Sequence, residues 1–305
     1  MRENFPCGIW PVMLTPFTNQ NEVDYNGLKE LVEWYIQHRV DGLFAVCQSS
    51  EMFKLSLEER VNIARKVKEY AADRIPVIAS GHISDNLEDQ KKELCAVAET
   101  GVDALILITN RMAKEDESDD VWISNTQELL DAIPEHVKLG LYECPYPYKR
   151  VMTEKTTKWC ADSGRFYFLK DTSCDIDNIK MKLRVLEGSP LRLYNANTAT
   201  LLESLEAGAY GYSGVMANMH PQLYRVLYDQ FESGDMTVLE EFLTMCALVE
   251  NHCYPINAKY YLQQYEHLNI GIHSRVKEEK DFFSFFKSEM SMLKHLTSIA
   301  EETYK

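Results

Sequence analysis

The chain has 305 residues and a formal net charge of −15, with 45% hydrophobic and 26% charged residues. This is the composition of a globular protein large enough for one α/β barrel or for two smaller domains. Its acidic surface would repel phosphate backbones and anionic lipids, so we expect neither nucleic acid nor a membrane as a partner.

Two kinds of local signal are missing from the sequence. No apolar stretch approaches the ~18 residues of a membrane helix, and the first residues do not have the pattern of a signal peptide. The eight cysteines are scattered without a Cys-x-x-Cys pair, and no zinc-binding or phosphate-binding motif is present. We therefore expect a cytoplasmic protein with reduced thiols, without a metal and without a nucleotide cofactor.

Short apolar segments alternate with amphipathic segments along the first three quarters of the chain. The apolar segments predict buried strands at residues 9–14, 43–46, 75–79, 104–108, 137–142, 166–170, 191–194 and 210–213. Asp24 is expected to cap the first helix, and Ser56 with Glu59 forms a capping box at the start of the second. Further helices are predicted at 85–99, 119–132, 153–161 and 199–207.

This alternation predicts a parallel sheet covered by helices. Eight units in series favour a closed (β/α)8 TIM barrel, whereas the alternative, an open doubly wound sheet, usually carries a glycine-rich first turn that residues 19–23 lack. We predict the barrel over residues 1–233 and a C-terminal helical domain over residues 234–305. Helical periodicity in that domain occurs at 238–250, 258–268 and 276–300.

Catalytic residues of such barrels lie at the carboxyl ends of the strands, and Lys170 closes the apolar strand Phe166–Lys170. Burial would lower the pKa of this lysine, because the charged form loses its water, and a neutral amine can attack a carbonyl. The alternative is a structural lysine that reaches from the strand end to solvent. Tyr142 ends the preceding strand, where a phenol can move protons during imine formation or serve as an ordinary buried aromatic residue.

Several segments, in order along the chain, resemble the dihydrodipicolinate synthase and N-acetylneuraminate lyase family of class I, pyruvate-type lyases. They are VMLTPF (12–17), DGL (41–43), SSE (49–51), LSLEER (55–60), YECP (142–145), LKDTS (169–173) and YPINAK (254–259). The 28-residue step from Tyr142 to Lys170 also resembles the interval in that family. The resemblance implies that Lys170 forms an imine with pyruvate or another 2-oxo acid, that Tyr142 relays protons, and that no separate cofactor takes part. It further implies a homo-oligomer, either a dimer or a tetramer.

The substrate carboxylate of this family is bound after strand 2, which here corresponds to Gln48 and Ser49, with Ser50 in the same loop. Neutral donors grouped in such a loop can hold a carboxylate without a cationic side chain. We also predict substrate contacts from polar residues at the ends of other strands. These are Arg111, Thr172, Asn195, Asn197 and Ser213, with capping and turn formation as the alternative for the two asparagines. His82 is a further candidate, although a loop histidine is more often structural.

Three loops depart from the family pattern. Residues 47–51 read CQSSE where the family usually has Gly-Thr/Ser-Thr-Gly-Glu, and Ser50 would be strained if the glycine it replaces adopts a positive φ. Arg111 and Met112 stand where many members have an aromatic pair, and Arg111 is expected to meet either an acidic substrate group or the acidic stretch 115–120. Dihydrodipicolinate synthases carry an arginine shortly after the tyrosine motif. Here residues 146–148 read YPY, with Lys149 and Arg150 slightly beyond, which counts against that activity.

The favoured function is a Schiff-base lyase or aldolase acting on pyruvate or a 2-oxo sugar acid, with an aldehyde as the second small molecule. Two alternatives use the same lysine, namely a dehydratase or hydratase of a 2-oxo acid and a dihydrodipicolinate synthase-like condensing enzyme. A fourth hypothesis, from a different class, is a non-catalytic binding or regulatory barrel. The presence of both Tyr142 and Lys170 argues against this last one.

Overall fold

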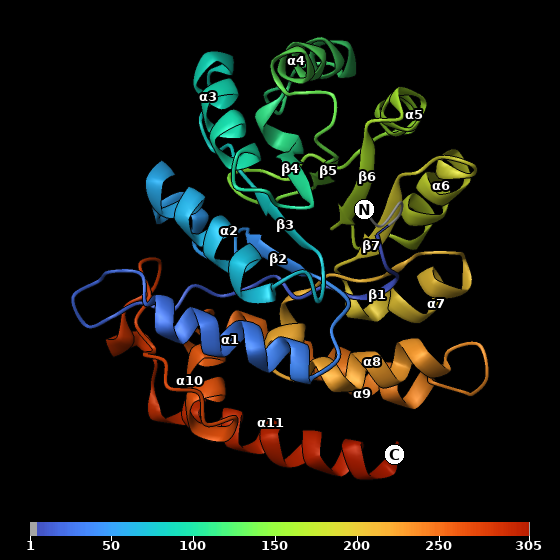
Figure 1. Cartoon of the computed structure of the whole chain (residues 1–305). Coiled ribbons are helices and arrows are strands. Elements are labelled where there is room, and N and C mark those ends of the chain that lie inside the picture. The colour runs from blue at the N-terminus through green and yellow to red at the C-terminus, as the bar shows by residue number, and fades with distance from the viewer. Residues whose placement is uncertain (1–4, 305) are drawn as a thin grey trace.

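The computed structural model describes residues 5–304, and it contains one sheet of eight parallel strands in the order β1-β8-β7-β6-β5-β4-β3-β2. A parallel bridge between Val12 and Phe44 joins the segment after β1 to β2, so the sheet curls round on itself. Helices surround the strands, and the C-terminal helices lie beside α1 and α8 (Figure 1). The predicted TIM barrel with additional C-terminal helices is confirmed.

The elements have the following bounds. The strands are β1 (Gly8–Ile9), β2 (Leu43–Val46), β3 (Val77–Ser80), β4 (Ala104–Ile108), β5 (Leu139–Tyr142), β6 (Phe166–Asp171), β7 (Arg192–Asn195) and β8 (Gly211–Tyr212). The barrel helices are α1 (Tyr25–Gln37), α2 (Leu57–Ala71), α3 (Leu87–Ala98), α4 (Asp119–Ala132), α5 (Glu154–Ser163), α6 (Ile176–Leu186), α7 (Leu201–Glu206) and α8 (Pro221–Gln230). They are followed by α9 (Thr237–Cys246), α10 (Ile256–Tyr265) and α11 (Ser284–Thr303). Among the short 3-10 turns, η4 (Val215–Asn218) precedes α8 and η5 (Ala247–Asn251) follows α9.

The two predicted helix starts are confirmed. The Asp24 carboxylate accepts hydrogen bonds from the backbone N–H groups of Asn26 and Gly27, at 3.1 and 3.0 Å. Ser56 and Glu59 exchange side-chain to backbone bonds of 2.8 and 3.1 Å. Both caps satisfy N–H groups that the helix itself leaves without partners.

The C-terminal helices differ from the periodicity of their sequence. The last helix begins at Ser284 and not near residue 276, because the Glu51 carboxylate accepts bonds from the backbone N–H groups of Arg275 (2.6 Å) and Val276 (3.1 Å). These long-range bonds hold the segment in a non-helical path. Similarly, α9 ends at Cys246, and residues 247–251 form the tighter turn η5.

Glu51 also ties the loop after β2 to the C-terminal helices. Its carboxylate lies 2.7 Å from the Lys259 ammonium, and their side chains are 1% and 0% exposed. The hydroxyl of Ser274 donates a further bond of 2.9 Å to the same carboxylate. Because an unpaired buried charge is costly, this arrangement favours one placement of the C-terminal helices on the barrel.

A layer of buried aromatic rings fills the barrel interior below the strand ends. Phe168 stacks on Tyr194 with ring centroids 4.2 Å apart, and it contacts Trp10 at 5.0 Å and Phe44 at 6.3 Å. Phe44 in turn meets the ring of Tyr142 at 5.5 Å. Side chains at the carboxyl ends of β5 and β6 therefore rest on an apolar floor, which removes water from beneath them.

A fully buried ionic cluster lies outside the same strand ends. Lys182 of α6 binds the carboxylates of Asp171, at 2.5 Å, and of Glu143, and all three side chains are 0% exposed. Burial alone would lower the pKa of Lys182, but the two carboxylates outweigh it and raise that pKa. Glu143 follows Tyr142 and Asp171 follows Lys170 in the chain. The cluster therefore holds the ends of β5 and β6 at the positions where the candidate catalytic residues lie.

Replacing Lys182 with methionine is expected to lower the free energy of unfolding by about 3–5 kcal/mol, because two carboxylates lose their buried counter-ion. The matched control is Lys180→Met on the same helix, whose surface pair with Glu203 at 2.5 Å is worth at most about 1 kcal/mol. Urea denaturation of both variants checks the difference. Equal losses would contradict the proposed importance of the cluster.

Candidate active site

Lys170 and Tyr142 lie side by side at the carboxyl ends of neighbouring strands. They are paired in the register of β5 and β6, and the Lys170 ammonium lies 5.3 Å from the centroid of the Tyr142 ring. Each residue is 4% exposed. The Lys170 Nζ donates a hydrogen bond to the backbone carbonyl of Ser213, directly after β8. The fold thus brings together three of the predicted site residues.

The environment of Lys170 favours a neutral amine. Its burial lowers the pKa to about 8, against weaker opposing contributions from Cys47 and Glu250. No carboxylate among the described residues forms an ion pair with this lysine, which sets it apart from buried Lys182 and Lys259. Near neutral pH a useful fraction of Lys170 therefore carries the free electron pair that a nucleophile needs.

Tyr142 has an unexpected partner. Its hydroxyl is hydrogen-bonded to the thiol of Cys144, whose Sγ also lies 3.6 Å from the amide oxygen of the exposed Gln48. Burial raises the pKa of the Tyr142 phenol well above its ordinary value and that of the Cys144 thiol to about 11. Both groups stay protonated at neutral pH and can donate. Cys144 belongs to the YECP motif, so its proximity to Tyr142 was visible in the sequence, but its role was not predicted.

The loop after β2 is shaped by Ser50. Its hydroxyl accepts from the backbone N–H of Cys47 at 2.7 Å and donates to the Cys47 carbonyl at 2.6 Å, and its own carbonyl accepts from Thr15 at 2.9 Å. Ser50 does not adopt a positive φ. The left-handed residue is Glu51, with φ 63°. The strain considered for Ser50 is therefore absent, and its side chain holds the loop together.

Ser49 and Ser213 follow β2 and β8, the two strands that flank β1 in the curled sheet. Ser49 is buried and hydrogen-bonded to the hydroxyl of Tyr254, which belongs to the C-terminal part of the chain and accepts from the amide of Asn218 at 3.1 Å. The buried hydroxyl of Ser213 has no hydrogen-bond partner within residues 5–304. Ser213 is thus a free donor beside Lys170.

Three other residues that we predicted to contact the substrate hold loops in place instead. The Thr172 hydroxyl donates to the Glu143 carbonyl at 2.6 Å. The Asn195 amide donates to the hydroxyls of Thr200 and Ser204 at 3.0 and 3.1 Å, and its oxygen accepts from the Asn197 backbone at 2.8 Å. The Asn197 oxygen accepts from the Thr200 hydroxyl at 3.2 Å. Both asparagines thus make turn-forming contacts, which was the alternative to substrate binding.

Arg111 does not bind the acidic stretch 115–120, and that expectation is wrong. Its guanidinium pairs with Asp85 at 2.6 Å and lies over the ring of Phe53 at 5.4 Å. Arg150 occupies the acidic stretch instead, with bonds to the carbonyls of Lys114 (2.7 Å) and Glu117 (3.0 Å) and to Asp119 (3.3 Å). Both side chains are long, so partners that are distant in the chain and brought near by the fold decide their direction.

His82 is a structural residue. Its Nε2 accepts from the backbone N–H of Ile108 at 2.6 Å, and its Nδ1 lies 2.8 Å from the amide oxygen of Gln90. Burial lowers the pKa of this imidazole to about 4, so it is neutral and connects β3 to β4. It is therefore fully engaged and has no free nitrogen for a substrate.

Glu250 is a site residue that sequence reasoning missed. It lies in η5, and it acts electrostatically on Lys170. Burial raises the pKa of its carboxyl to about 7, although Lys170 opposes this shift. No local motif marks the residue, because only the packing of η5 against η4 brings it to the barrel mouth.

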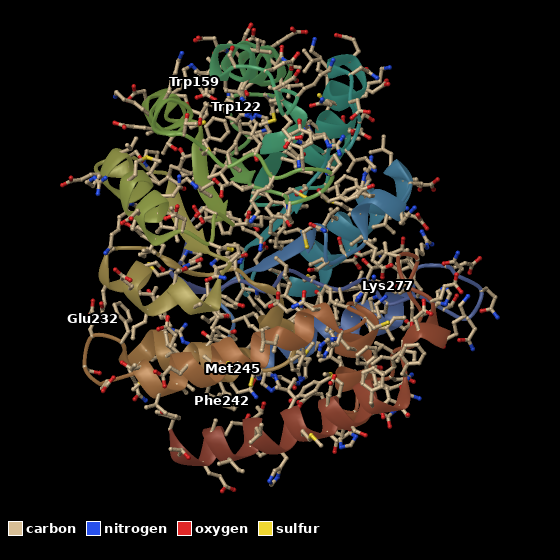
Figure 2. All side chains as sticks on the ribbon, turned by 180° about the vertical axis from the view of Figure 1, so that it is seen from behind. Trp122, Trp159, Glu232, Phe242, Met245 and Lys277 are labelled. Carbon is tan, nitrogen blue, oxygen red and sulfur yellow. The ribbon has the colours of Figure 1, made fainter. Side chains whose placement is uncertain are left out.

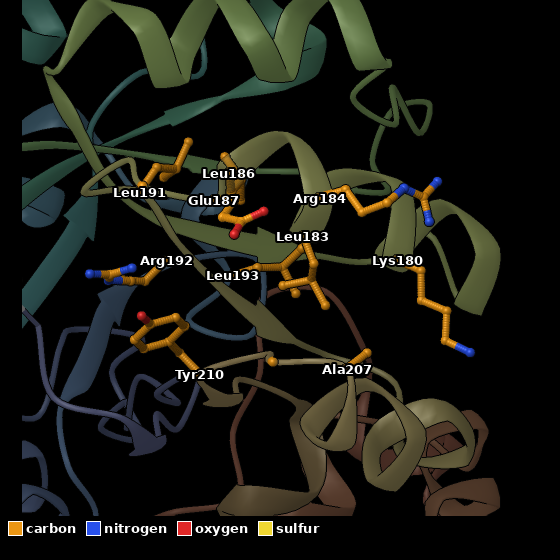
Figure 3. Close-up of a pocket in the computed structure, with 12 residues that line it drawn as sticks. Lys180, Leu183, Arg184, Leu186, Glu187, Leu191, Arg192, Leu193, Ala207 and Tyr210 are labelled. Carbon is orange, nitrogen blue, oxygen red and sulfur yellow. The ribbon is translucent and has the colours of Figure 1, made fainter.

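A cavity of about 490 Å³ lies at the opposite end of the barrel (Figure 3). Its lining includes Lys180 and Arg184 of α6, Arg192 at the start of β7, and Tyr210 just before β8. Lys170 sits at the carboxyl end of its strand, so this cavity is separate from the candidate active site. Within residues 5–304, no group of three or more His, Cys, Asp or Glu side chains is arranged to hold a metal ion, and no helix is long and apolar enough to cross a membrane.

Comparison with known proteins agrees with the sequence motifs. Over 261 residues the chain is 28% identical to a 4-hydroxy-tetrahydrodipicolinate synthase of Thioalkalivibrio sulfidiphilus, which covers 84% of this chain and 87% of that protein. The dihydrodipicolinate synthase of Bacillus anthracis has a similar fold, with a TM-score of 0.85 at 19% identity over 96% of this chain and 98% of that one.

Two further solved structures share the fold. CdNal from Clostridium difficile, in complex with mannosamine, has a TM-score of 0.84 at 16% identity and covers 95% of this chain and 99% of its own. YagE, a prophage protein of E. coli K12 in complex with pyruvate, has a TM-score of 0.80 at 20% identity and covers 97% of this chain and 98% of its own. The model of the dihydrodipicolinate synthetase family matches residues 6–270. With the barrel, its motifs and this match together, the chain belongs to the dihydrodipicolinate synthetase family.

Proposed function

We propose that this protein is a class I lyase or aldolase that converts a 2-oxo acid through an imine on Lys170. The observation that carries the proposal is the buried amine of Lys170, with its pKa lowered to about 8, beside the Tyr142 phenol at the barrel mouth. The neutral amine adds to the C2 carbonyl to form a carbinolamine. Tyr142 delivers a proton to the hydroxyl of the carbinolamine. That hydroxyl then leaves as water, and an imine results.

The imine then withdraws electrons from C3, so that a C3–H or C3–C4 bond can break to give an enamine. Donors near Ser49 would hold the carboxylate of the 2-oxo acid, and the unpartnered hydroxyl of Ser213 is available beside Lys170. Cys144 would support proton transfer through Tyr142, because its thiol is hydrogen-bonded to the phenol. A bound pyruvate in the E. coli relative agrees with this choice of substrate class.

The engaged basic side chains favour a lyase or dehydratase of a hydroxylated 2-oxo acid over a dihydrodipicolinate synthase-like condensing enzyme. Arg150 binds the segment 114–119, and the Lys149 ammonium donates to the Thr172 carbonyl at 2.7 Å. Neither is free to bind the second carboxylate of a dicarboxylic intermediate. A 2-oxo sugar acid needs only one carboxylate site and acceptors for its hydroxyls.

We further propose that the chain forms a homo-oligomer, a dimer or a tetramer. Large apolar side chains are exposed on its C-terminal helices, including Met245 (65%) on α9 and Met292 (62%) on α11. Figure 2 shows Met245 and Phe242 on α9, above the red helix α11. Such side chains are typical of protein–protein contacts.

Light scattering on the purified protein is expected to give the mass of a dimer or a tetramer, because the exposed apolar helix faces gain free energy when another copy covers them. A monomer at micromolar concentration would contradict the oligomer and would leave the chemistry at Lys170 untouched.

Incubation with pyruvate and borohydride is expected to modify Lys170, because reduction traps the imine as a stable secondary amine. Mass spectrometry of a proteolytic digest locates the adduct. Lys170→Ala should prevent labelling, whereas Lys158→Ala on the exposed surface of α5 should leave it unchanged. An unmodified Lys170 after exposure to pyruvate and to 2-oxobutanoate would refute the proposal.

The rate of imine formation should follow the titration of Lys170. Below pH 8 the neutral fraction falls by about a factor of ten per pH unit, so the rate with dilute pyruvate should rise with pH and level off above about 8. Quenched-flow trapping between pH 6 and 10 measures this profile. A rate that keeps rising to ~10.4, the ordinary lysine value, would show that Lys170 is not desolvated.

A further inference from the structure

The motif YPINAK (254–259) lies in the C-terminal part of the chain, and two of its side chains reach the loop after β2. Its last residue, Lys259, binds the carboxylate of Glu51 at 2.7 Å, two positions after Ser49. Its first residue, Tyr254, is hydrogen-bonded through its hydroxyl to Ser49 itself. The motif therefore lies against the loop that we expect to hold the substrate carboxylate.

A buried amide holds the Tyr254 hydroxyl from another side. Asn218 is 0% exposed, and its Nδ2 donates to the Tyr254 hydroxyl at 3.1 Å and to the Val12 carbonyl at 2.9 Å. Asn218 ends η4, the turn that begins two residues after Ser213, whose carbonyl accepts from Lys170. Tyr254 is thereby anchored between the loop after β2 and the turn after β8.

The direction of these hydrogen bonds follows from the surroundings of Asn218. Val12 offers a carbonyl, which can only accept, so the NH2 group of the amide must face it. The amide oxygen accepts from the hydroxyl of Tyr35. Because the same NH2 group faces Tyr254, the phenol oxygen accepts from Asn218 and keeps its own proton.

The phenol proton of Tyr254 is available to a ligand. A phenol oxygen can accept from both Asn218 and the Ser49 hydroxyl and still donate its proton. Within residues 5–304, these two residues are the only hydrogen-bond partners of the hydroxyl. Burial raises the pKa of the phenol well above its ordinary value, so the proton stays on the oxygen at neutral pH. The C-terminal part of the chain thus supplies a neutral donor beside Ser49.

We propose that Tyr254 is a substrate-binding residue whose hydroxyl donates a hydrogen bond to the carboxylate of the 2-oxo acid. A hydrogen bond to a charged acceptor is stronger than one between neutral groups, and this one adds no buried cation. The C-terminal helices thereby complete a site on the barrel, because Asn218 and Lys259 hold Tyr254 and its motif against the loop after β2. This inference rests on the proposed imine mechanism, since it assigns a contact to that substrate.

Tyr254→Phe removes only the hydroxyl, and two ketones test its role. Pyruvate carries the carboxylate, whereas acetone lacks it, and cyanoborohydride traps the imine of either one on Lys170. The pyruvate concentration for half-saturation should rise by about 10–100-fold, the effect of losing a hydrogen bond to a charged group. The trapping rate at saturating pyruvate should equal that of the wild type. Trapping with acetone should be unchanged at every concentration.

Two further variants serve as controls. Tyr260→Phe removes a phenol hydroxyl on the outer side of α10, where the Tyr260 ring contacts Phe282 at 5.2 Å, and should behave as wild type with both ketones. Ser49→Ala shows whether Tyr254 contacts the substrate or only places Ser49. In that background, Tyr254→Phe should still raise the half-saturating pyruvate concentration by about tenfold or more.

Three results would overturn the inference alone. Wild-type half-saturation in Tyr254→Phe would show that the hydroxyl does not bind the carboxylate. An equal loss with pyruvate and with acetone would show that Tyr254 acts on Lys170 or on the fold. No further loss in the Ser49→Ala background would show that Tyr254 only places Ser49. A wild-type protein that traps neither pyruvate nor 2-oxobutanoate would instead refute the imine mechanism, and this failure is recognised before any variant is made.

Discussion

The buried contact of Lys182 with Glu143 and Asp171 sets the geometry on which the site depends. Successive strand residues point to opposite faces, so a residue fixed outside the barrel fixes the direction of the one before it. Glu143 and Asp171 point outward to Lys182, and Tyr142 and Lys170 therefore point inward at the same level. Apolar residues could fill the same space, but they would not fix the register of β5 relative to β6.

The interior side of these strands supplies the opposite environment. Below Lys170 lies the aromatic layer around Phe168, and the nearest fixed acceptor is the Ser213 carbonyl, which is uncharged. Two buried lysines, one on β6 and one on α6, thus acquire different properties at the ends of one strand pair. Lys182 has two carboxylates and stays charged, whereas Lys170 has none and loses part of its affinity for a proton. Desolvation makes a reactive amine only where a counter-ion is withheld.

The net charge of −15 would repel the anionic 2-oxo acid that we propose as the substrate. The cationic side chains near the strand ends do not offset this repulsion, because Arg111 and Arg150 are paired with Asp85 and with the segment 114–119. Neutral donors around Ser49 would provide the attraction for the one carboxylate of the proposed substrate. The loops that depart from the family pattern thus agree with the proposed substrate, which has a single carboxylate and hydroxyls beyond it.

The local sequence was sufficient for the barrel, the caps at Asp24 and Ser56, and the placement of Lys170 and Tyr142 at the ends of adjacent strands. These features depend on periodicity and on contacts between near neighbours, which a single sequence displays directly. The tertiary structure alone decided the non-helical path of residues 275–276, the partners of Arg111, and the approach of Glu250 to Lys170. Each of these depends on a group far away in the chain, such as Glu51 for Arg275 or Asp85 for Arg111. The energy of a buried charge or hydrogen bond is set by what folding brings around it, and that is why such residues carry no signal of their own in the sequence.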